Sequence, residues 1–381
     1  MNPAVTAFSR EVREFLDEHL TDDMRHRMHR TGTFHDWDLH RAMAARGWLA
    51  AAVPGSPDAR DPFEMAALFR ELELADAPYH GLSVTMIVAG VVQQAGSDEV
   101  KAKVLPQILA GDALACLGYS EPDHGSDVAA ASTRAVPNDD APTTWTINGQ
   151  KMWTTLSHVS QYVLLLTRTD PDVPKHRGLT MFLVPLDSPG ITIQAVHTMS
   201  GDRTNVTFYD DVVVGDEYRI GDVHGGWRVM GVALGLERGV MGGNGHCELL
   251  LKDALAWAAA EGMLERDSVR EVLARTRIDV EVAWLLSQHT ACIAASGGLP
   301  SVEGSMTKLF ATETYKRAAR AWQDLAGSAG LLDMDAPGAI AHGAIERAGR
   351  HAPLTTIYGG TSEIQRNNIA ERHLGLPRGV R

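Results

Sequence analysis

The sequence predicts a multi-domain α+β protein with helical domains at both ends and a β domain between them. Before residue 112 and after residue 223, apolar residues recur at spacings of three and four, which is the helical period. The middle part has short runs of β-branched and aromatic residues between loops rich in Pro, Gly and Asp, as in a small β-barrel or sandwich. At 381 residues the chain also exceeds one usual core. We expect an N-terminal helical domain (1–112), a central β domain (113–222) and a C-terminal helical bundle (223–381).

The individual elements follow from the same patterns. Helices are predicted over residues 11–18, 37–48, 63–74, 82–92 and 100–109, and again over 227–260, 266–297, 303–327 and 361–373. Strands are predicted over 145–151, 162–167, 179–185, 191–196 and 205–209. The pair Asn148-Gly149 is a strong signal for a tight hairpin turn.

Composition and charge exclude several classes of function. With a net charge of -13 the chain offers no general basic face to a nucleic acid. The longest apolar run, Leu82–Val92, is too short to span a bilayer, so we expect no membrane contact. The N-terminus lacks a signal-peptide pattern and the cysteines lack disulfide spacing, so a cytoplasmic location is expected. The 16 histidines form no metal-binding pattern, and His26 and His29 are expected to face solvent on a charged helix.

Two segments of the predicted β domain carry residues suited to a planar, phosphate-bearing ligand. In Tyr119–Asp127, Gly125 and Ser126 supply a tight turn with free N–H groups and a hydroxyl, although an ordinary turn explains them equally well. In Asn148–Thr155, Trp153 could stack beside a planar cofactor, although a lone Trp on a strand is more often part of a core.

A glycine-dense helix follows the β domain. Gly231, Gly235, Gly239 and Gly243 recur every four residues, which predicts one smooth face on which another backbone can pack. Glu237 lies off that face in a mostly apolar helix. Such a carboxylate is either a base with a raised pKa or half of a structural pair with Arg238 or another cation.

A second glycine pair, in Tyr358–Arg366, precedes the last predicted helix. Ser362 and Gln365 fit the capping-box pattern at the start of that helix. The free N–H groups there could receive negative charge, or the segment could be a plain helix cap.

In their order and spacing these segments resemble the acyl-CoA dehydrogenase family. The matching stretches are Ser120-Glu-Pro-Asp-His-Gly-Ser-Asp127, Asn148-Gly-Gln-Lys-Met-Trp-Thr-Thr155, Gly225-Gly-Trp with Leu236-Glu-Arg238, and Tyr358-Gly-Gly-Thr-Ser-Glu-Ile-Gln-Arg366. The resemblance covers essentially the whole chain. It implies that FAD lies between the β domain and a C-terminal four-helix bundle, and that the chain dehydrogenates an acyl-CoA.

The resemblance also implies roles for individual residues. Tyr119, Ser120, Gly125 and Ser126 would line the flavin, with Ser126 also near the acyl-CoA. Trp153 and Thr155 would contact the isoalloxazine, Thr361 and Glu363 would reach the FAD diphosphate, and Arg238 would contact the substrate. Gln323 and Gly327 would serve the FAD site of a neighbouring subunit.

The base that removes the substrate's α-proton can be assigned in the same way. In many members of the family it follows the Tyr of the late Tyr-x-Gly-Thr motif, where this chain has Gly359, which has no side chain. A second branch, including isovaleryl- and long-chain-type enzymes, carries the base in Leu-Glu-Arg, which here is Glu237. The resemblance therefore implies that Glu237 takes the α-proton while flavin N5 takes the β-hydride, giving a 2-enoyl-CoA from a roomy or branched acyl group.

One family motif is missing. Members usually carry Arg-x-x-Phe-Gly after the catalytic helix, with the Arg on the FAD of an adjacent subunit, but Ala258–Arg266 occupies that region here. Some steroid side-chain dehydrogenases of the family lack part of this clamp and work as heterotetramers. We expect a homodimer or homotetramer, or a heterotetramer with a related chain, and an electron-transferring flavoprotein as acceptor. The alternatives are a flavin-dependent oxidase or monooxygenase of the same fold, or a non-catalytic partner subunit.

Overall fold

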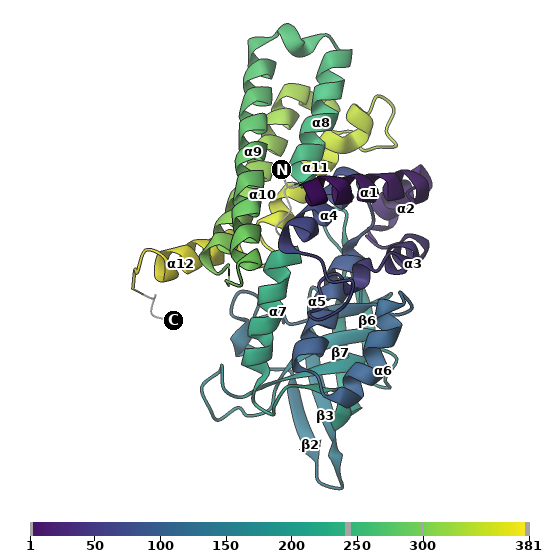
Figure 1. The fold of residues 1–381 in the computed structure, drawn as a ribbon, viewed down its shortest axis with the longest axis vertical. Coiled ribbons are helices and arrows are strands. Elements are labelled where there is room, and N and C mark those ends of the chain that lie inside the picture. Colours follow the sequence, from purple (N-terminus) through teal and green to yellow (C-terminus); the bar gives the residue numbers. More distant parts are fainter. Residues whose placement is uncertain (1–2, 241–244, 299, 378–381) are drawn as a thin grey trace.

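The structure, a computed structural model, describes residues 3–240, 245–298 and 300–377, with the side chains of residues 238–240 left aside. Helices occupy both ends of the chain and a sheet lies between them (Figure 1). The predicted fold class is confirmed. The division into domains at 112/113 and 222/223 stays a prediction.

The N-terminal part is helical. Its elements are α1 (Pro3–His19), α2 (Asp22–Thr31), α3 (Trp37–Ala45), α4 (Pro62–Leu74), α5 (His80–Ala95) and α6 (Asp98–Leu109), with one 3₁₀ turn, η1 (Trp48–Ala50). Helix α5 is apolar on nearly every side because α6, the first strand and the first C-terminal helix cover it.

The middle part forms an eight-stranded sheet. Its strands are β1 (Ala115–Gly118), β2 (Arg134–Asn138), β3 (Ala141–Lys151), β4 (Tyr162–Arg168), β5 (Leu179–Pro185), β6 (Ile191–His197), β7 (Arg203–Gly215) and β8 (Arg219–Ile220). They follow the order β6-β7-β3-β2-β4-β5-β8, and β1 pairs in parallel with β4. Strand β4 is buried at every residue because its alternate side chains enter two different cores, Leu164 on one face and Leu165 on the other.

The predicted hairpin turn at Asn148-Gly149 is wrong. These residues lie inside β3, and the β2–β3 turn is at Asp139-Asp140. Gly149 has φ +143, and the pairing of β3 with β7 shifts register beside it. A Cβ at Gly149 would lie 2.7 Å from the Cα of Thr133. The glycine therefore marks an irregularity in a paired strand and a close backbone approach.

The C-terminal part is again helical. Its helices are α7 (Gly226–Val240), α8 (Gly245–Ala260), α9 (Asp267–Ala295), α10 (Val302–Ala326), α11 (Ala344–Thr355) and α12 (Ser362–Arg372). Helices α8 to α11 pack together around Trp322, which has no exposed surface. Helix α7 reaches from this bundle to the sheet, where it contacts β5 and α5 (Figure 1).

The glycine face predicted on α7 has no partner within the chain where it is described. Gly231 and Gly235 are exposed, and a Cβ at either would meet nothing within 4 Å. Gly243 lies outside the described residues. The prediction that another backbone packs on this face is therefore not met by this chain alone.

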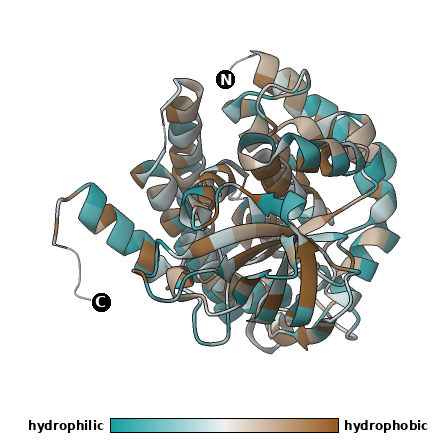
Figure 2. Ribbon diagram, turned by 90° about the horizontal axis from the view of Figure 1, so that it is seen from below, coloured by the Kyte–Doolittle hydropathy of each residue, from teal (hydrophilic) through white to brown (hydrophobic). Residues whose placement is uncertain are grey.

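The sheet lies at the end of the molecule opposite the α8–α9 end of the bundle (Figure 1), and the view onto it shows apolar stretches along the strands, while α12 projects outward with a mostly hydrophilic surface (Figure 2). Among the described helices, none combines the length and apolar character that crossing a membrane requires.

Candidate active site

The predicted base and the empty glycine position lie close together. Glu237 is half-buried near the C-terminal end of α7, and it faces the turn between α11 and α12. In that turn Gly359 has φ +63, a left-handed conformation that favours glycine. A Cβ built at Gly359 would lie 3.6 Å from Oε1 of Glu237. By the resemblance, the base is carried either at the Gly359 position or at the Glu237 position. In this chain both positions border the same space.

Lys308 of α10 reaches the same turn. Its Nζ donates a hydrogen bond to the carbonyl oxygen of Gly360 at 2.8 Å. Its Cε is 4.0 Å from the Cβ position at Gly359. Burial lowers the pKa of Lys308 to about 8, although the nearby carboxylates, Glu237 foremost, oppose the shift. No sequence pattern singled out this residue, since one lysine on an amphipathic helix is usually solvated.

Tyr119, just beyond β1, is also close enough to Glu237 for the two side chains to interact electrostatically. Its hydroxyl is buried and has no hydrogen-bond partner among the described residues. Burial, with a smaller contribution from the charge of Glu237, raises the pKa of Tyr119 well above its usual range. Buried hydroxyls are nearly always hydrogen-bonded, so the chemistry of this atom fits a polar edge of a bound cofactor.

Trp153 presents its ring to solvent from a strained position. It has φ +64 and is 52% exposed, both unusual for a tryptophan. The flanking backbone is tied down, because the N–H of Met152 donates to the Ser120 carbonyl at 2.9 Å and the N–H of Thr154 donates to that of Asn205 at 2.9 Å. The core alternative for Trp153 is therefore wrong, because its ring is exposed to solvent.

Hydrogen bonds connect Thr155 and Ser120 to neighbouring segments. The hydroxyls of Thr155 and Thr204 are hydrogen-bonded at 3.1 Å. The Ser120 carbonyl is the acceptor for Met152. The structure thus brings the segments 119–127 and 148–155 together, as the resemblance implied.

A buried ion pair joins these two segments. Nζ of Lys151, with no exposed surface, donates to Oε1 of Glu121 at 2.8 Å and to the carbonyl of Tyr119 at 3.2 Å. The Glu121 carboxylate also accepts hydrogen bonds from Ser132 and the N–H of Thr133. Burial alone would raise the pKa of Glu121, but Lys151 and these donors outweigh it and lower the pKa. Neither residue was assigned a role from the sequence.

The predicted phosphate-binding residues are exposed at two loops. Gly125 and Ser126 face solvent, and a Cβ at Gly125 would meet nothing within 4 Å. Thr361 is the N-cap of α12, since its Oγ1 accepts the N–H of Ile364 at 3.2 Å. Glu363 is exposed in the first turn of that helix.

The predicted capping box at this helix is wrong. Ser362 donates to Oε1 of Glu313 at 2.6 Å, and the amide of Gln365 donates to the Gly359 carbonyl at 2.9 Å. The cap is one residue earlier than predicted because Thr361 is the last residue with extended backbone. Gln365 instead stabilises the glycine turn beside Glu237.

Gln323 and Gly327 do not join the group around Glu237. They lie at the other end of α10 from Lys308, and the 15-residue separation corresponds to roughly 22 Å of helix. The amide of Gln323 packs on Gly349 of α11, and Gly327 ends α10 with φ +59 and open space around it. The side chain of Arg238 lies outside the described residues.

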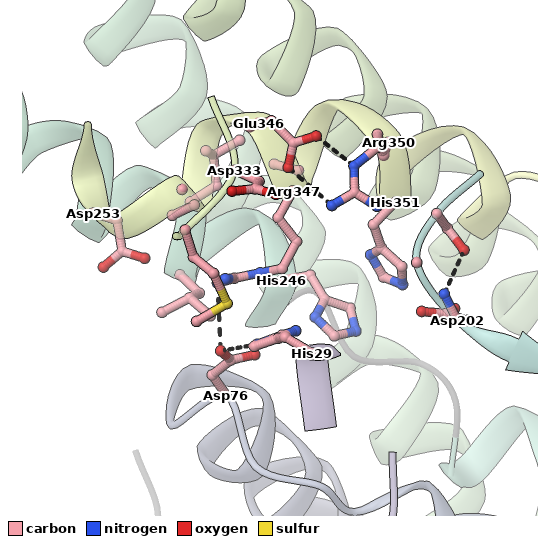
Figure 3. Close-up of a pocket in the computed structure, with 18 of the residues that line it drawn as sticks. His29, Asp76, Asp202, His246, Asp253, Asp333, Glu346, Arg347, Arg350 and His351 are labelled. Carbon is pink, nitrogen blue, oxygen red and sulfur yellow. Dashed lines mark hydrogen bonds and ion pairs between the residues drawn. The ribbon is translucent and has the colours of Figure 1, made fainter. Parts of the chain in front are cut away.

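A polar cavity of about 100 Å³ lies apart from these residues, where α2, the β6–β7 turn and helices α8 and α11 meet (Figure 3). The expectation that His29 faces solvent is wrong, because its ring is buried there and its Nε2 is 2.6 Å from Oδ2 of Asp76. Arg347 approaches the same oxygen at 3.4 Å. Burial would raise the pKa of Asp76, but these two partners lower it to about 2.

Comparison with known proteins identifies the family. The models for the acyl-CoA dehydrogenase N-terminal, middle and C-terminal domains match residues 2–112, 116–212 and 224–374. The chain belongs to the acyl-CoA dehydrogenase family. It is therefore an oxidoreductase that acts on acyl-CoA.

Two curated relatives align with this acyl-CoA dehydrogenase over essentially its whole length. The acyl-CoA dehydrogenase FadE26 of Mycobacterium tuberculosis is 32% identical, with 100% of this chain and 98% of the relative covered. The acyl-CoA dehydrogenase IpdE1 of Mycolicibacterium smegmatis is 30% identical, with 99% of each covered.

Solved structures of the family show the same arrangement. The steroid acyl-CoA dehydrogenase Tcur3481-Tcur3483 superposes with a TM-score of 0.92 at 31% identity, over 100% of this chain and 99% of that one. The ChsE4-ChsE5 complex from Mycobacterium tuberculosis gives a TM-score of 0.89 at 32% identity, with the same coverage.

Proposed function

We propose that the chain catalyses FAD-dependent α,β-dehydrogenation of an acyl-CoA thioester, with Glu237 as the base. The main observation in support of Glu237 as the base is the distance of 3.6 Å between its Oε1 and the Cβ position at Gly359. Many members of the family carry their base at the Gly359 position. Here the carboxylate reaches the same space from α7, and the glycine leaves room for it.

The residues that the resemblance assigns to the cofactor fit a flavin. Tyr119 has a buried hydroxyl that lacks a partner among the described residues, and Trp153 offers a ring that is 52% exposed. Gly125 and Ser126 line an exposed turn, and Thr361 opens a helix N-terminus where negative charge is favoured. Ser120, Thr155 and Glu363 complete this surface. When bound there, FAD supplies the acceptor for the hydride that leaves the substrate's β-carbon.

The chain itself supplies the proton chemistry. A base within hydrogen-bond reach of the α-carbon removes the proton, and its efficiency depends on a pKa suited to the working pH. The half-buried position of Glu237 excludes part of the water that would otherwise solvate it. We place Ser126 and Arg238 along the substrate.

We further propose a bulky acyl group, such as a steroid side chain. Gly359 places no side chain of its own beside Glu237, so this turn takes up less of the space around the proposed base. The superposed structure Tcur3481-Tcur3483 is itself a steroid acyl-CoA dehydrogenase.

Anaerobic titration of the flavin-loaded protein with a panel of acyl-CoA thioesters tests the proposal. The panel runs from butyryl-CoA to steroid side-chain thioesters. We expect a bulky thioester to bleach the flavin absorbance with one equivalent and a short straight chain to bleach it poorly. If no thioester bleaches the flavin, the chain is not a dehydrogenase.

A related partner chain is proposed to complete the flavin site. Gln323 and Gly327 are far from Glu237 within one chain, and Ala258–Arg266, from the last residues of α8 to the start of α9, lacks the family's clamp motif. The ChsE4-ChsE5 structure is a complex of two chains. Purification of this chain alone with stoichiometric, non-dialysable flavin would favour a homo-oligomer instead. An electron-transferring flavoprotein is the proposed acceptor.

A further inference from the structure

We propose that Lys308 is a positioning residue of this site: it anchors the Gly359–Gly360 turn and holds a positive charge beside the Glu237 carboxylate. The inference rests on the proposed role of Glu237 as the base. It assigns a task to a residue of α10 that none of the sequence motifs contains.

The anchor is a single hydrogen bond across a long stretch of sequence. Nζ of Lys308 donates to the carbonyl of Gly360 at 2.8 Å. Gly359 and Gly360 have φ values of +63 and +82, so the turn bends sharply and depends on outside contacts to keep its shape. The side-chain amide of Gln365 donates to the carbonyl oxygens of Gly359 and Gly360, at 2.9 Å and 3.2 Å. Lys308 and Gln365 thus hold the turn from two sides, through α10 and α12.

The positive charge of Lys308 lies close to the proposed base, Glu237. Oε1 of Glu237 and Cε of Lys308 lie 3.6 Å and 4.0 Å from one point, the Cβ position at Gly359. Lys308 is half-buried, so water screens its charge less than on an open surface. A nearby ammonium favours the ionised form of a carboxylate, and only the ionised form can accept the α-proton.

Other charged groups face the same region and have to be considered with Lys308. They are Glu237 on α7, Glu313 on α10, Glu363 and Arg366 on α12, and the phenol of Tyr119 after β1. Glu313 accepts from Ser362 and pairs with Arg366 at 3.6 Å, so part of its charge is already balanced. Glu363 is exposed at the start of α12. Glu237 is the carboxylate with the largest electrostatic effect on Lys308.

The first experiment reads the carboxylate directly, in protein without flavin. Isotope-edited infrared spectroscopy would follow the titration of Glu237, assigned by the band that Glu237→Gln removes. We expect Lys308→Met to move the midpoint upward by about one pH unit, a tenfold change in the protonation equilibrium. Lys308→Arg should restore it, and Lys316→Met, at an exposed lysine about two turns along α10, should leave it unchanged.

The second experiment measures the pH dependence of flavin reduction in the loaded protein. Lys308→Met should shift the acidic limb of the rate profile to higher pH by the same amount, with substrate affinity nearly constant. A lowered rate at every pH with an unmoved limb and an unmoved infrared midpoint would overturn the proposal and leave Lys308 a purely structural contact. Since the infrared titration needs no turnover, it stays decisive even if no acyl-CoA reduces the flavin.

Discussion

Glu121 and Lys151 form an ion pair that is almost completely removed from solvent, and each of the two segments proposed to line the flavin supplies one of them. Replacing Lys151 with Met leaves an ionised carboxylate buried among groups that cannot neutralise it. We expect Lys151→Met to lower the free energy of unfolding by about 3–5 kcal/mol. Urea denaturation followed by circular dichroism measures this.

The matched control is Lys175→Met. Lys175 pairs with Asp127 at 2.7 Å, but both side chains are about 40% exposed. An exposed pair contributes little, so we expect a loss below about 1 kcal/mol. If both variants lost the same free energy of unfolding, burial would not determine how much the Glu121–Lys151 pair contributes to stability.

The sequence motifs predicted some site residues and left others out for physical reasons. Taken alone, Gly125 and Trp153 fitted an ordinary turn and a core residue as well as a cofactor site, and only the order and spacing of the motifs assigned them to the flavin. Lys308 and the pairing of Glu121 with Lys151 depend on contacts between distant segments. Residue spacing carries no signal for such contacts. For Glu237, spacing alone favoured a structural pair over a base, and the glycine at position 359 reversed that preference.

At the scale of elements, two glycines test opposite expectations. Gly149 has φ +143, and a Cβ there would lie 2.7 Å from the Cα of Thr133. Gly149→Ala should therefore destabilise the protein by more than about 1 kcal/mol. Gly231 is inside α7 with open space around it, so Gly231→Ala should be neutral or stabilise by up to about 1 kcal/mol. Thermal unfolding of both variants measures the difference, and a change of the same sign in both would contradict this account.

The errors at the element scale share one cause. The Asn148-Gly149 pair fits a hairpin turn locally, but pairing of β3 with both β2 and β7 keeps the strand continuous through it. Helix α11 (Ala344–Thr355) was not predicted, since Gly349 and Pro353 interrupt its helical pattern. Its packing against α10 and α8 compensates for these residues. The ends of long helices such as α9 and α10 were predicted to within about two residues. Their apolar period repeats over many turns, so single interrupting residues do not hide it.

At the scale of the whole molecule, Asp76 connects the N-terminal helices to the C-terminal bundle through His29 and Arg347 (Figure 3). Its pKa is about 2 in the folded chain, below the usual 3.8. The native state therefore binds this proton less readily than the unfolded state does. The resulting stability, about 2 kcal/mol, is fully present above pH ~4 and is lost as the pH falls through 2.

Asp76→Asn should remove this contribution. We expect the free energy of unfolding at pH 7 to fall by about 2 kcal/mol and its slope between pH 4 and pH 2 to flatten. Asp22→Asn, at a fully exposed position at the start of α2, serves as the control and should leave both unchanged. An unaltered slope in Asp76→Asn would show that other carboxylates govern the acid response.

The rate of flavin reduction in Glu237→Gln tests the central claim most directly. Stopped-flow mixing of the loaded protein with a saturating acyl-CoA that bleaches the wild-type flavin measures this rate. Glutamine keeps the shape of the side chain but cannot accept the α-proton. We predict a fall of about 10²–10⁴-fold with substrate affinity nearly unchanged, while Glu14→Gln, at an exposed position on α1, reacts like wild type. Reduction of Glu237→Gln at the wild-type rate would contradict the assignment of Glu237 as the base.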